Sequence, residues 1–183
     1  MKRTKGFTIA ELFIVVAIIG VLVAISIPIF NKQLEKAREA YDIDTMRTAA
    51  SAAIDLYYEG INEKNAYKYG FKWWPDNSGK GADNAAGAYD LRTGKFVPDK
   101  TKILSYGKGT ERNGGTTFVL GNSNGAYKPD ESYTKAVVMV AIYPNGKNPH
   151  ADVFWKTNKD GNNYIGGEQG TNNPKYCIRI PLN

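Results

Sequence analysis

Cysteine and histidine are almost missing from this chain, which has one of each among its 183 residues. A single cysteine, Cys177, excludes a disulfide within the chain. In the stretch KYCIRI it stands among alternating apolar residues, which predicts a buried thiol on a strand. The lone histidine, His150, forms no His/Cys cluster of the kind that binds zinc. With no nucleophile–base pair in the sequence, we expect no metal, no cofactor and no enzymatic activity.

Grouped carboxylates are scarce as well. Residues 156–164, KTNKDGNNY, superficially resemble a calcium-binding loop. However, Asp160 has no companion carboxylates at alternate positions, which a site with roughly six to eight oxygen ligands would need. We therefore interpret Asp160-Gly161 as a plain turn.

Polar side chains are absent from Leu12–Ile25, which reads LFIVVAIIGVLVAI. The wider segment 7–30 is long enough to cross a bilayer core as a helix, which needs ~20 residues. The mean hydropathy of the whole chain is only −0.43, so its hydrophobicity is concentrated at this end. Lys2, Arg3 and Lys5 precede the segment and favour a cytoplasmic N-terminus. A secretory signal peptide would be shorter and would end in small residues before its cleavage site.

Residues 5–30, KGFTIAELFIVVAIIGVLVAISIPIF, resemble the class III signal of type IV prepilins and related pseudopilins. That pattern is a basic leader ending in glycine, then Phe-Thr, a glutamate at the fifth mature position and a long apolar helix. The short leader and Phe7 resemble the type IVa subclass, although Ala10 stands where a larger aliphatic residue is usual. The resemblance implies a leader at 1–6, cleavage between Gly6 and Phe7 by a prepilin peptidase, and N-methylation of Phe7.

Glu11 is the acid inside the apolar segment. A charge placed toward the bilayer core costs on the order of a few kcal/mol. The helix dipole would stabilise an acid near the helix start by only ~0.3–1 kcal/mol. We therefore interpret Glu11 as a filament assembly residue that pairs with the Phe7 amine of a neighbouring subunit and penalises wrong docking. Its own Phe7 amine, four residues back, is a competing partner.

The helix is expected to kink or break at Gly20 and Pro28, because glycine and proline both disfavour helix interiors. The resemblance implies partial unwinding of this segment in assembled filaments. An amphipathic helix should follow over 31–60, ending near Glu59 with Gly60 as the stop. Two apolar stripes on it predict a helix packed on both sides. The first stripe is Phe30, Leu34, Ala37, Tyr41, Thr48, Ala52 and Leu56, and the second is Ile29, Ala40, Ile43, Ala50, Ile54, Tyr57 and Ile61.

Charged side chains at helical spacing are expected to form ion pairs on the remaining helix faces, each worth tenths of a kcal/mol. These pairs are Glu35–Arg38, Lys36–Glu39 and Arg38–Asp42.

Residues 61–183 predict a β-rich globular head. Residues 60–115 look loop-like, and strands are expected at 116–121, 135–144, 151–156 and 175–182. The strand from residue 136 to 143 is almost continuously apolar, so it should be central and pack on the helix. The fold class is therefore α+β, with a long N-terminal helix, half of it membrane-spanning, on an antiparallel sheet. This is the pilin architecture by resemblance.

A possible ligand-binding surface is predicted at Lys72, Trp73 and Trp74, where aromatic rings and cations alternate. Such residues can stack bases or sugars, so DNA or a glycan is a candidate partner. Packing of the aromatic rings on the head is the more common outcome for such a loop.

The resemblance implies a structural subunit of a type IV pilus, made as a single-pass protein of the cytoplasmic membrane and polymerised into a cell-surface filament. Its partners would be further copies of itself, the prepilin peptidase and the inner-membrane pilus assembly machinery. Adhesion, motility and DNA uptake all remain open. A pseudopilin of a type II secretion or competence system is the alternative, and a single-span protein displaying a binding domain is a third interpretation. The missing disulfide and the Lys- and Asn-rich composition resemble pilins of Gram-positive bacteria such as clostridia.

Overall fold

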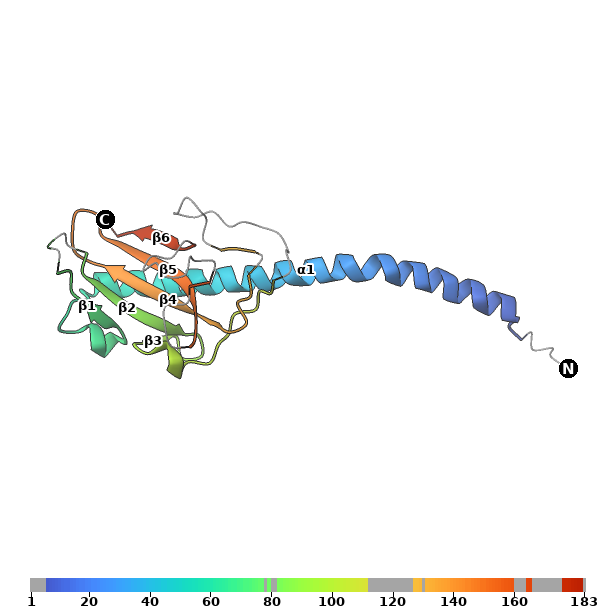
Figure 1. Cartoon of the computed structure of the whole chain (residues 1–183), viewed down its shortest axis with the longest axis horizontal. Helices are drawn as coiled ribbons and strands as arrows, with labels where there is room; N and C mark the ends of the chain where they lie inside the picture. Colours follow the sequence, from blue (N-terminus) through green and yellow to red (C-terminus); the bar gives the residue numbers. More distant parts are fainter. Residues whose placement is uncertain are drawn as a thin grey trace.

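A long helix joined to a β-rich head makes up the molecule (Figure 1). The computed structural model describes residues 6–77, 79, 82–111, 127–129, 131–159, 164–165 and 176–182. Helix α1 spans Ile9–Tyr58. Its C-terminal part lies against an antiparallel sheet, whereas its N-terminal part extends away from the head. The predicted α+β class is therefore confirmed.

Local sequence explains where α1 begins and ends. Thr8 caps the first turn, because its hydroxyl accepts the backbone N–H of Glu11 at 3.3 Å. At the other end, Gly60 adopts a φ of +81°, a left-handed conformation that most side chains avoid. Its N–H donates to the carbonyl of Tyr57 at 2.9 Å. The predicted end near Glu59, with Gly60 as the stop, is confirmed.

The described strands form one antiparallel sheet in the order β1-β2-β4-β5-β6, with β3 also paired to β2. The strands are β1 (Lys72–Trp74), β2 (Asn84–Asp90), β3 (Lys95–Val97), β4 (Ala136–Tyr143), β5 (His150–Thr157) and β6 (Ile178–Pro181). Two short 3₁₀ helices, η1 (Ala66–Tyr69) and η2 (Lys100–Lys102), lie in the connections. Strands β4 and β5 pair along their whole lengths, which confirms two of the predicted strands. The strand predicted at 116–121 lies outside the described residues.

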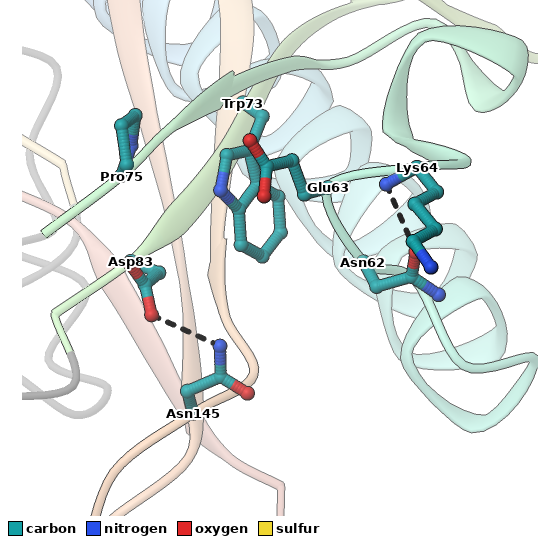
Figure 2. Close-up of a pocket in the computed structure, with 7 residues that line it drawn as sticks. All are labelled: Asn62, Glu63, Lys64, Trp73, Pro75, Asp83 and Asn145. Atoms are coloured by element: carbon teal, nitrogen blue, oxygen red, sulfur yellow. Dashed lines mark hydrogen bonds between the residues drawn. The ribbon is translucent and has the colours of Figure 1, made fainter.

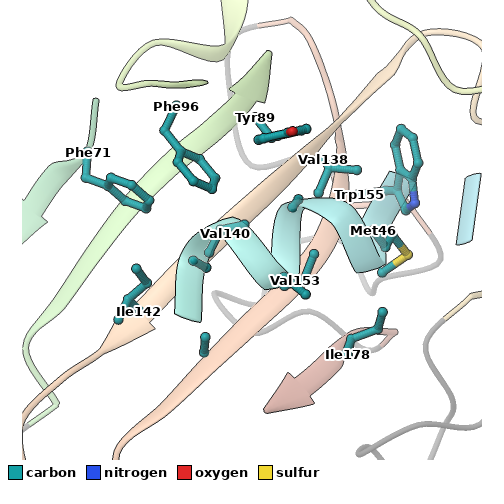
Figure 3. Packing of buried hydrophobic residues seen from close by; sticks show 14 of the residues in the cluster. Met46, Phe71, Tyr89, Phe96, Val138, Val140, Ile142, Val153, Trp155 and Ile178 are labelled. Carbon is teal, nitrogen blue, oxygen red and sulfur yellow. The ribbon is translucent and has the colours of Figure 1, made fainter. Parts of the chain in front are cut away.

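Strand β4 is buried on both of its faces, which explains its unbroken apolar sequence. Val138, Val140 and Ile142 pack toward α1 in the larger core cluster. Figure 3 shows this cluster, with the α1 turn that carries Met46 lying over β4 and β5. Val137 and its alternate neighbours face the other way, into a second cluster that includes Cys177. The predicted central position of this strand and the predicted burial of Cys177 are both confirmed.

The expectation that residues 60–115 are loop-like is wrong for β2, which pairs with β4 inside the sheet. Its sequence, NAAGAYD, is poor in the β-branched and aromatic residues that favour strands. Close packing explains the small side chains. A Cβ atom on Gly87 would stand 2.7 Å from the Gly70 carbonyl oxygen and 3.1 Å from the Phe71 ring. The need for a glycine at this contact outweighs strand propensity.

Strand β6 fixes the C-terminal segment to the edge of the sheet. It pairs with β5 from Ile178 opposite Val153 to Pro181 opposite His150. Arg179 adds a two-bond contact to Asp152, from Nε to Oδ1 and from Nη2 to Oδ2, both at 2.7 Å. Backbone pairing and this ion pair hold the segment to the sheet.

Candidate functional site

The N-terminal part of α1 has no packing partner within the described chain. Every residue from Gly6 to Leu34 is exposed, including Phe7 at 87% and Phe13 at 71%. By length and composition this part of the helix could cross a membrane, and its most apolar window is 0% buried. Burying a large apolar side chain is worth about 1.5–3 kcal/mol. None of the described residues covers this part of the helix, so its apolar surface is available to a lipid or protein partner.

Glu11 belongs to a capping box at the start of that helix. Its Oε2 atom accepts the backbone N–H of Thr8 and the Thr8 hydroxyl, both at 2.8 Å, while the Thr8 hydroxyl accepts the Glu11 N–H. Reciprocal bonds of this kind satisfy two otherwise unpaired donors at a helix start. Both bonds end on Oε2, and no described residue donates to Oε1. The carboxylate therefore keeps one oxygen available for a second partner.

The sequence-based interpretation of Glu11 did not include its capping box with Thr8, although the sequence contains the pattern. Threonine followed three residues later by glutamate, just before an apolar run, is the pattern of a capping box. Our two local explanations of Glu11, the helix dipole and the amine of its own Phe7, omitted it.

Gly20 and Pro28 lie inside a helix that is continuous from Ile9 to Tyr58. Figure 1 shows a gentle curve along α1, so the helix break expected at Gly20 and Pro28 is wrong for the single chain. Between the two residues, the Ser26 hydroxyl donates to the Leu22 carbonyl at 2.7 Å, a bond that slightly weakens and bends helices. The expected unwinding concerns the assembled filament and stays a prediction.

The two apolar stripes predicted on the second part of α1 differ sharply in burial. The first is largely outward-facing, with Leu34 at 39% and Tyr41 at 41% exposed. In the second stripe, Ile43 and Ala50 are buried in the core of the head, whereas Ala40 is exposed. One face of the helix thus packs on its own sheet, and another is not covered by any described residue.

Three acids lie on the buried face of α1: Glu35, Glu39 and Asp42. Asp42 accepts the backbone N–H groups of Lys108 and Gly109, both at 2.8 Å, and the Tyr127 hydroxyl at 2.9 Å. Burial raises the pKa of Asp42 above its ordinary value despite these bonds. The carboxylate ties residues 108–109 to the helix.

Glu35 fixes the next residue of the same segment. Its carboxylate accepts the backbone N–H of Thr110, the Thr110 hydroxyl at 2.8 Å and Nη1 of Arg38 at 3.1 Å. Burial alone would raise the pKa of Glu35, but the Thr110 hydrogen bonds and the Arg38 charge together lower it. The predicted Glu35–Arg38 pair is therefore present, whereas Asp42 bonds to the head rather than to Arg38.

Lys72, Trp73 and Trp74 do not share one surface, because adjacent residues of a strand point to opposite faces. Lys72 Nζ lies 4.3 Å from the ring centroid of Trp74, which is 50% exposed. Trp73 packs against the core cluster from the other face and lines a recess at the end of the head (Figure 2). Only Trp73 of the three lines this recess.

Comparison with known proteins relates the chain to fimbrial subunits. A fimbrial protein of Pseudomonas aeruginosa is 36% identical over 104 residues, covering 50% of this chain and 68% of that protein. A fimbrial protein of Moraxella nonliquefaciens is 29% identical over 168 residues, covering 90% and 96%. The type IV major pilin protein PilE1 of Neisseria gonorrhoeae is 35% identical over 97 residues, covering 53% and 39%. No protein-family model and no solved structure matches the chain.

These relatives are named as fimbrial proteins and pilins, and the long exposed helix and α+β head are what the resemblance at residues 5–30 predicts. Their shared identity as fimbrial proteins and pilins also agrees with the interpretation that the chain is not an enzyme. The chain belongs to the type IV pilin family and is a structural subunit of a pilus.

Proposed function

We propose that this chain is made as a membrane-anchored prepilin, cleaved between Gly6 and Phe7, N-methylated at Phe7 and polymerised through its N-terminal helix. The proposal rests on the fully exposed, largely apolar segment from Gly6 to Leu34, most of it helical, which holds a single acid. Lipid covers this surface before assembly, and the helices of neighbouring copies cover it afterwards.

The proposed cleavage bond lies in accessible backbone. Gly6, Phe7 and Thr8 precede the first helical residue, Ile9, and all three are exposed. A peptidase must draw its substrate into an extended form, which costs least where no helical hydrogen bond is broken. The prepilin peptidase would therefore cut at the base of the helix and leave its capping box intact.

Glu11 would set the register between subunits. The Thr8 bonds occupy its Oε2 atom, and no described residue donates a hydrogen bond to Oε1. The amine that cleavage creates on a neighbour's Phe7 would bind this carboxylate, strongly so in the low dielectric of packed helices. A misplaced neighbour would leave both charges unpaired, so the correct stagger is favoured.

A comparison of Glu11→Gln with Thr8→Ala tests this role. Glutamine preserves the capping box because its carbonyl oxygen still accepts from Thr8, but it removes the charge. We expect Glu11→Gln to be inserted and cleaved normally, while pili sheared from the cells fall by about tenfold or more. Thr8→Ala removes the cap, at about 1 kcal/mol, and keeps the charge, so assembly should stay near normal.

The measurement combines immunoblots of sheared pili and of membranes with the mass of the protein recovered from each fraction. Filament protein should begin at Phe7 and carry one added methyl group. Normal pilus yield from Glu11→Gln would show that Glu11 serves only as a cap. Filament protein that keeps residues 1–6 would overturn the processing scheme.

The assembled pilus would be anchored and extended by the inner-membrane pilus assembly machinery. Adhesion, motility or DNA uptake would follow from that extension.

A further inference from the structure

A recess of about 460 Å³ lies at the end of the head that is distant from the N-terminus (Figures 1 and 2). It is built by parts of the chain that are far apart in sequence. These are the loop after α1 at 62–64, strand β1 with the residue after it, the residue just before β2, and the β4–β5 turn. Its volume falls in the range of roughly 300–1,000 Å³ typical of small-ligand sites.

One wall of the recess is the indole ring of Trp73. The ring is half-buried and packs against the core of the head, so it is held in place from behind. In Figure 2 it stands between Asp83 with Asn145 on one side and Asn62 with Lys64 on the other. A fixed aromatic face bordered by polar groups suits a ligand with an apolar surface and hydroxyl groups at its edge.

The polar groups around the ring are held by hydrogen bonds of their own. Asp83 accepts the Asp76 N–H through Oδ1 at 2.6 Å and the Asn145 amide through Oδ2 at 3.1 Å. Asn62 accepts the Lys64 N–H at 3.0 Å. Each carboxylate or amide oxygen retains a further lone pair for a ligand hydroxyl. Ordering these groups in advance lowers the entropy cost of binding.

Glu63 adds a second carboxylate to the recess. It is exposed, and no hydrogen bond or ion pair joins its carboxylate to another described residue. Two carboxylates against one lysine, Lys64, make the lining net acidic, which disfavours phosphate and other anions. The polar rim also leaves a purely apolar ligand with too few partners for these groups.

We propose that this recess binds one or two pyranose rings of a neutral glycan. The C–H face of a sugar ring stacks on Trp73, and its hydroxyls donate to Asp83 and Glu63 and exchange bonds with Asn145. A neutral sugar presents both donors and acceptors, which matches a rim of carboxylates and amides. The Lys72–Trp74 pair lies on the other face of β1 and takes no part.

Sugar binding is tested on the full chain in a detergent that has no sugar headgroup. The probes are methyl β-D-galactopyranoside, methyl α-D-mannopyranoside and lactose, measured by saturation-transfer NMR, together with a glycan array. We expect at least one neutral sugar to bind at about millimolar strength. Trp73→Ala should weaken that binding by roughly tenfold.

Matched variants separate binding from folding. Glu63→Gln changes an exposed side chain and should weaken binding severalfold with an unchanged near-ultraviolet circular dichroism spectrum. Trp73→Phe keeps an aromatic ring in the wall and should retain part of the affinity even if Trp73→Ala lowers stability. Trp74→Ala removes the neighbouring indole on the opposite face and should leave sugar binding unchanged.

Three outcomes would overturn the proposal. These are absence of binding to every neutral glycan tested, an equal loss of binding in Trp74→Ala, and preference for N-acetylneuraminic acid or a thymidine oligonucleotide at Trp73. The site is tested on unassembled subunits. A failure here therefore leaves the assembly role of Glu11 untouched, and a failure of the Glu11 test leaves this site untouched.

Discussion

The two parts of α1 form one continuous helix but have opposite surroundings. From Gly6 to Leu34 every residue is exposed, although the segment is almost entirely apolar. From Glu35 onward the helix buries one face against the sheet, and that face includes acids. Soluble proteins usually bury apolar residues and expose charged ones. The reversal shows that the first part is adapted to surroundings that the head does not supply.

Two acids illustrate the same contrast. Asp42 finds its donors in the head of its own chain, at residues 108, 109 and 127. Among the described residues, Glu11 accepts hydrogen bonds only from Thr8, three residues earlier in the chain. An acid that is fully bonded within the chain serves the fold, whereas one that keeps a free oxygen on an exposed apolar helix is suited to a partner.

The largest expected difference between the two parts is the loss of unfolding free energy caused by Met46→Ala compared with Leu34→Ala. Met46 is 0% exposed and lies in the core of the head, so truncation should lower the free energy of unfolding by about 2–5 kcal/mol. Leu34 is part of the outward stripe, and its truncation should change that free energy by less than about 0.5 kcal/mol. Urea unfolding in micelles, followed by near-ultraviolet circular dichroism, measures both. Equal losses would show that Leu34 has an intramolecular partner and would break the comparison.

Pro28→Ala should have the next largest effect, confined to the exposed part. Proline inside a helix removes one backbone bond and costs about 3 kcal/mol relative to alanine. The substitution should therefore slow amide hydrogen exchange between residues 21 and 28 in micelles and leave the buried turn at 46–53 unchanged. We also expect fewer pili, because the stiffened segment would resist the unwinding proposed for assembly. Unchanged amide hydrogen exchange in residues 21–28 would mean that Pro28 does not destabilise this segment of α1.

Gly20→Ala is the milder companion to that substitution. It should also stabilise the helix and slow amide hydrogen exchange there, by about 1 kcal/mol, since glycine disrupts a helix less than proline does.

The helix and the central sheet could be predicted from sequence because their signals are local. Each of three patterns indicates one structure. These patterns are the apolar run to residue 30, Gly60 at the helix end and the continuous apolar residues of β4. Strand β2 could not be found this way. Its Gly87 is explained by the backbone of Gly70, seventeen positions away in the chain.

The site shows the same division between local and distant information. The resemblance at residues 5–30 directs attention to Gly6, Phe7 and Glu11, which are exposed at or just before the start of α1, and their roles stay predictions. The Thr8–Glu11 box is a local pattern that the sequence alone could have indicated. The roles of Glu35 and Asp42 depend on residues 66 to 85 positions away, and no helical spacing rule indicates them. The recess at Trp73 likewise depends on loops that only folding brings together.

The smallest expected effect is a difference in pH dependence between Asp42→Asn and Glu35→Gln. The pKa of Asp42 is raised above its ordinary 3.8, so the folded state takes up this proton before the unfolded state does. Its contribution to stability therefore grows as pH falls from neutral toward 3.8. The pKa of Glu35 is lowered below 4.5, so its contribution is complete above that value and is lost as pH falls through the folded pKa.

Unfolding free energies measured from pH 7 to pH 3.5 should thus separate the two acids. The cost of Asp42→Asn relative to the parent chain should increase on acidification, whereas the cost of Glu35→Gln should shrink. Asp44→Asn is the matched control, because Asp44 lies two residues from Asp42 on the same helix but is exposed. A slope for Asp44→Asn equal to that of Asp42→Asn would mean that the pH dependence arises from surface charge. Opposite pH dependences for Asp42→Asn and Glu35→Gln would show that the effect arises from the contacts of these acids with the head, which the N-terminal part of α1 lacks.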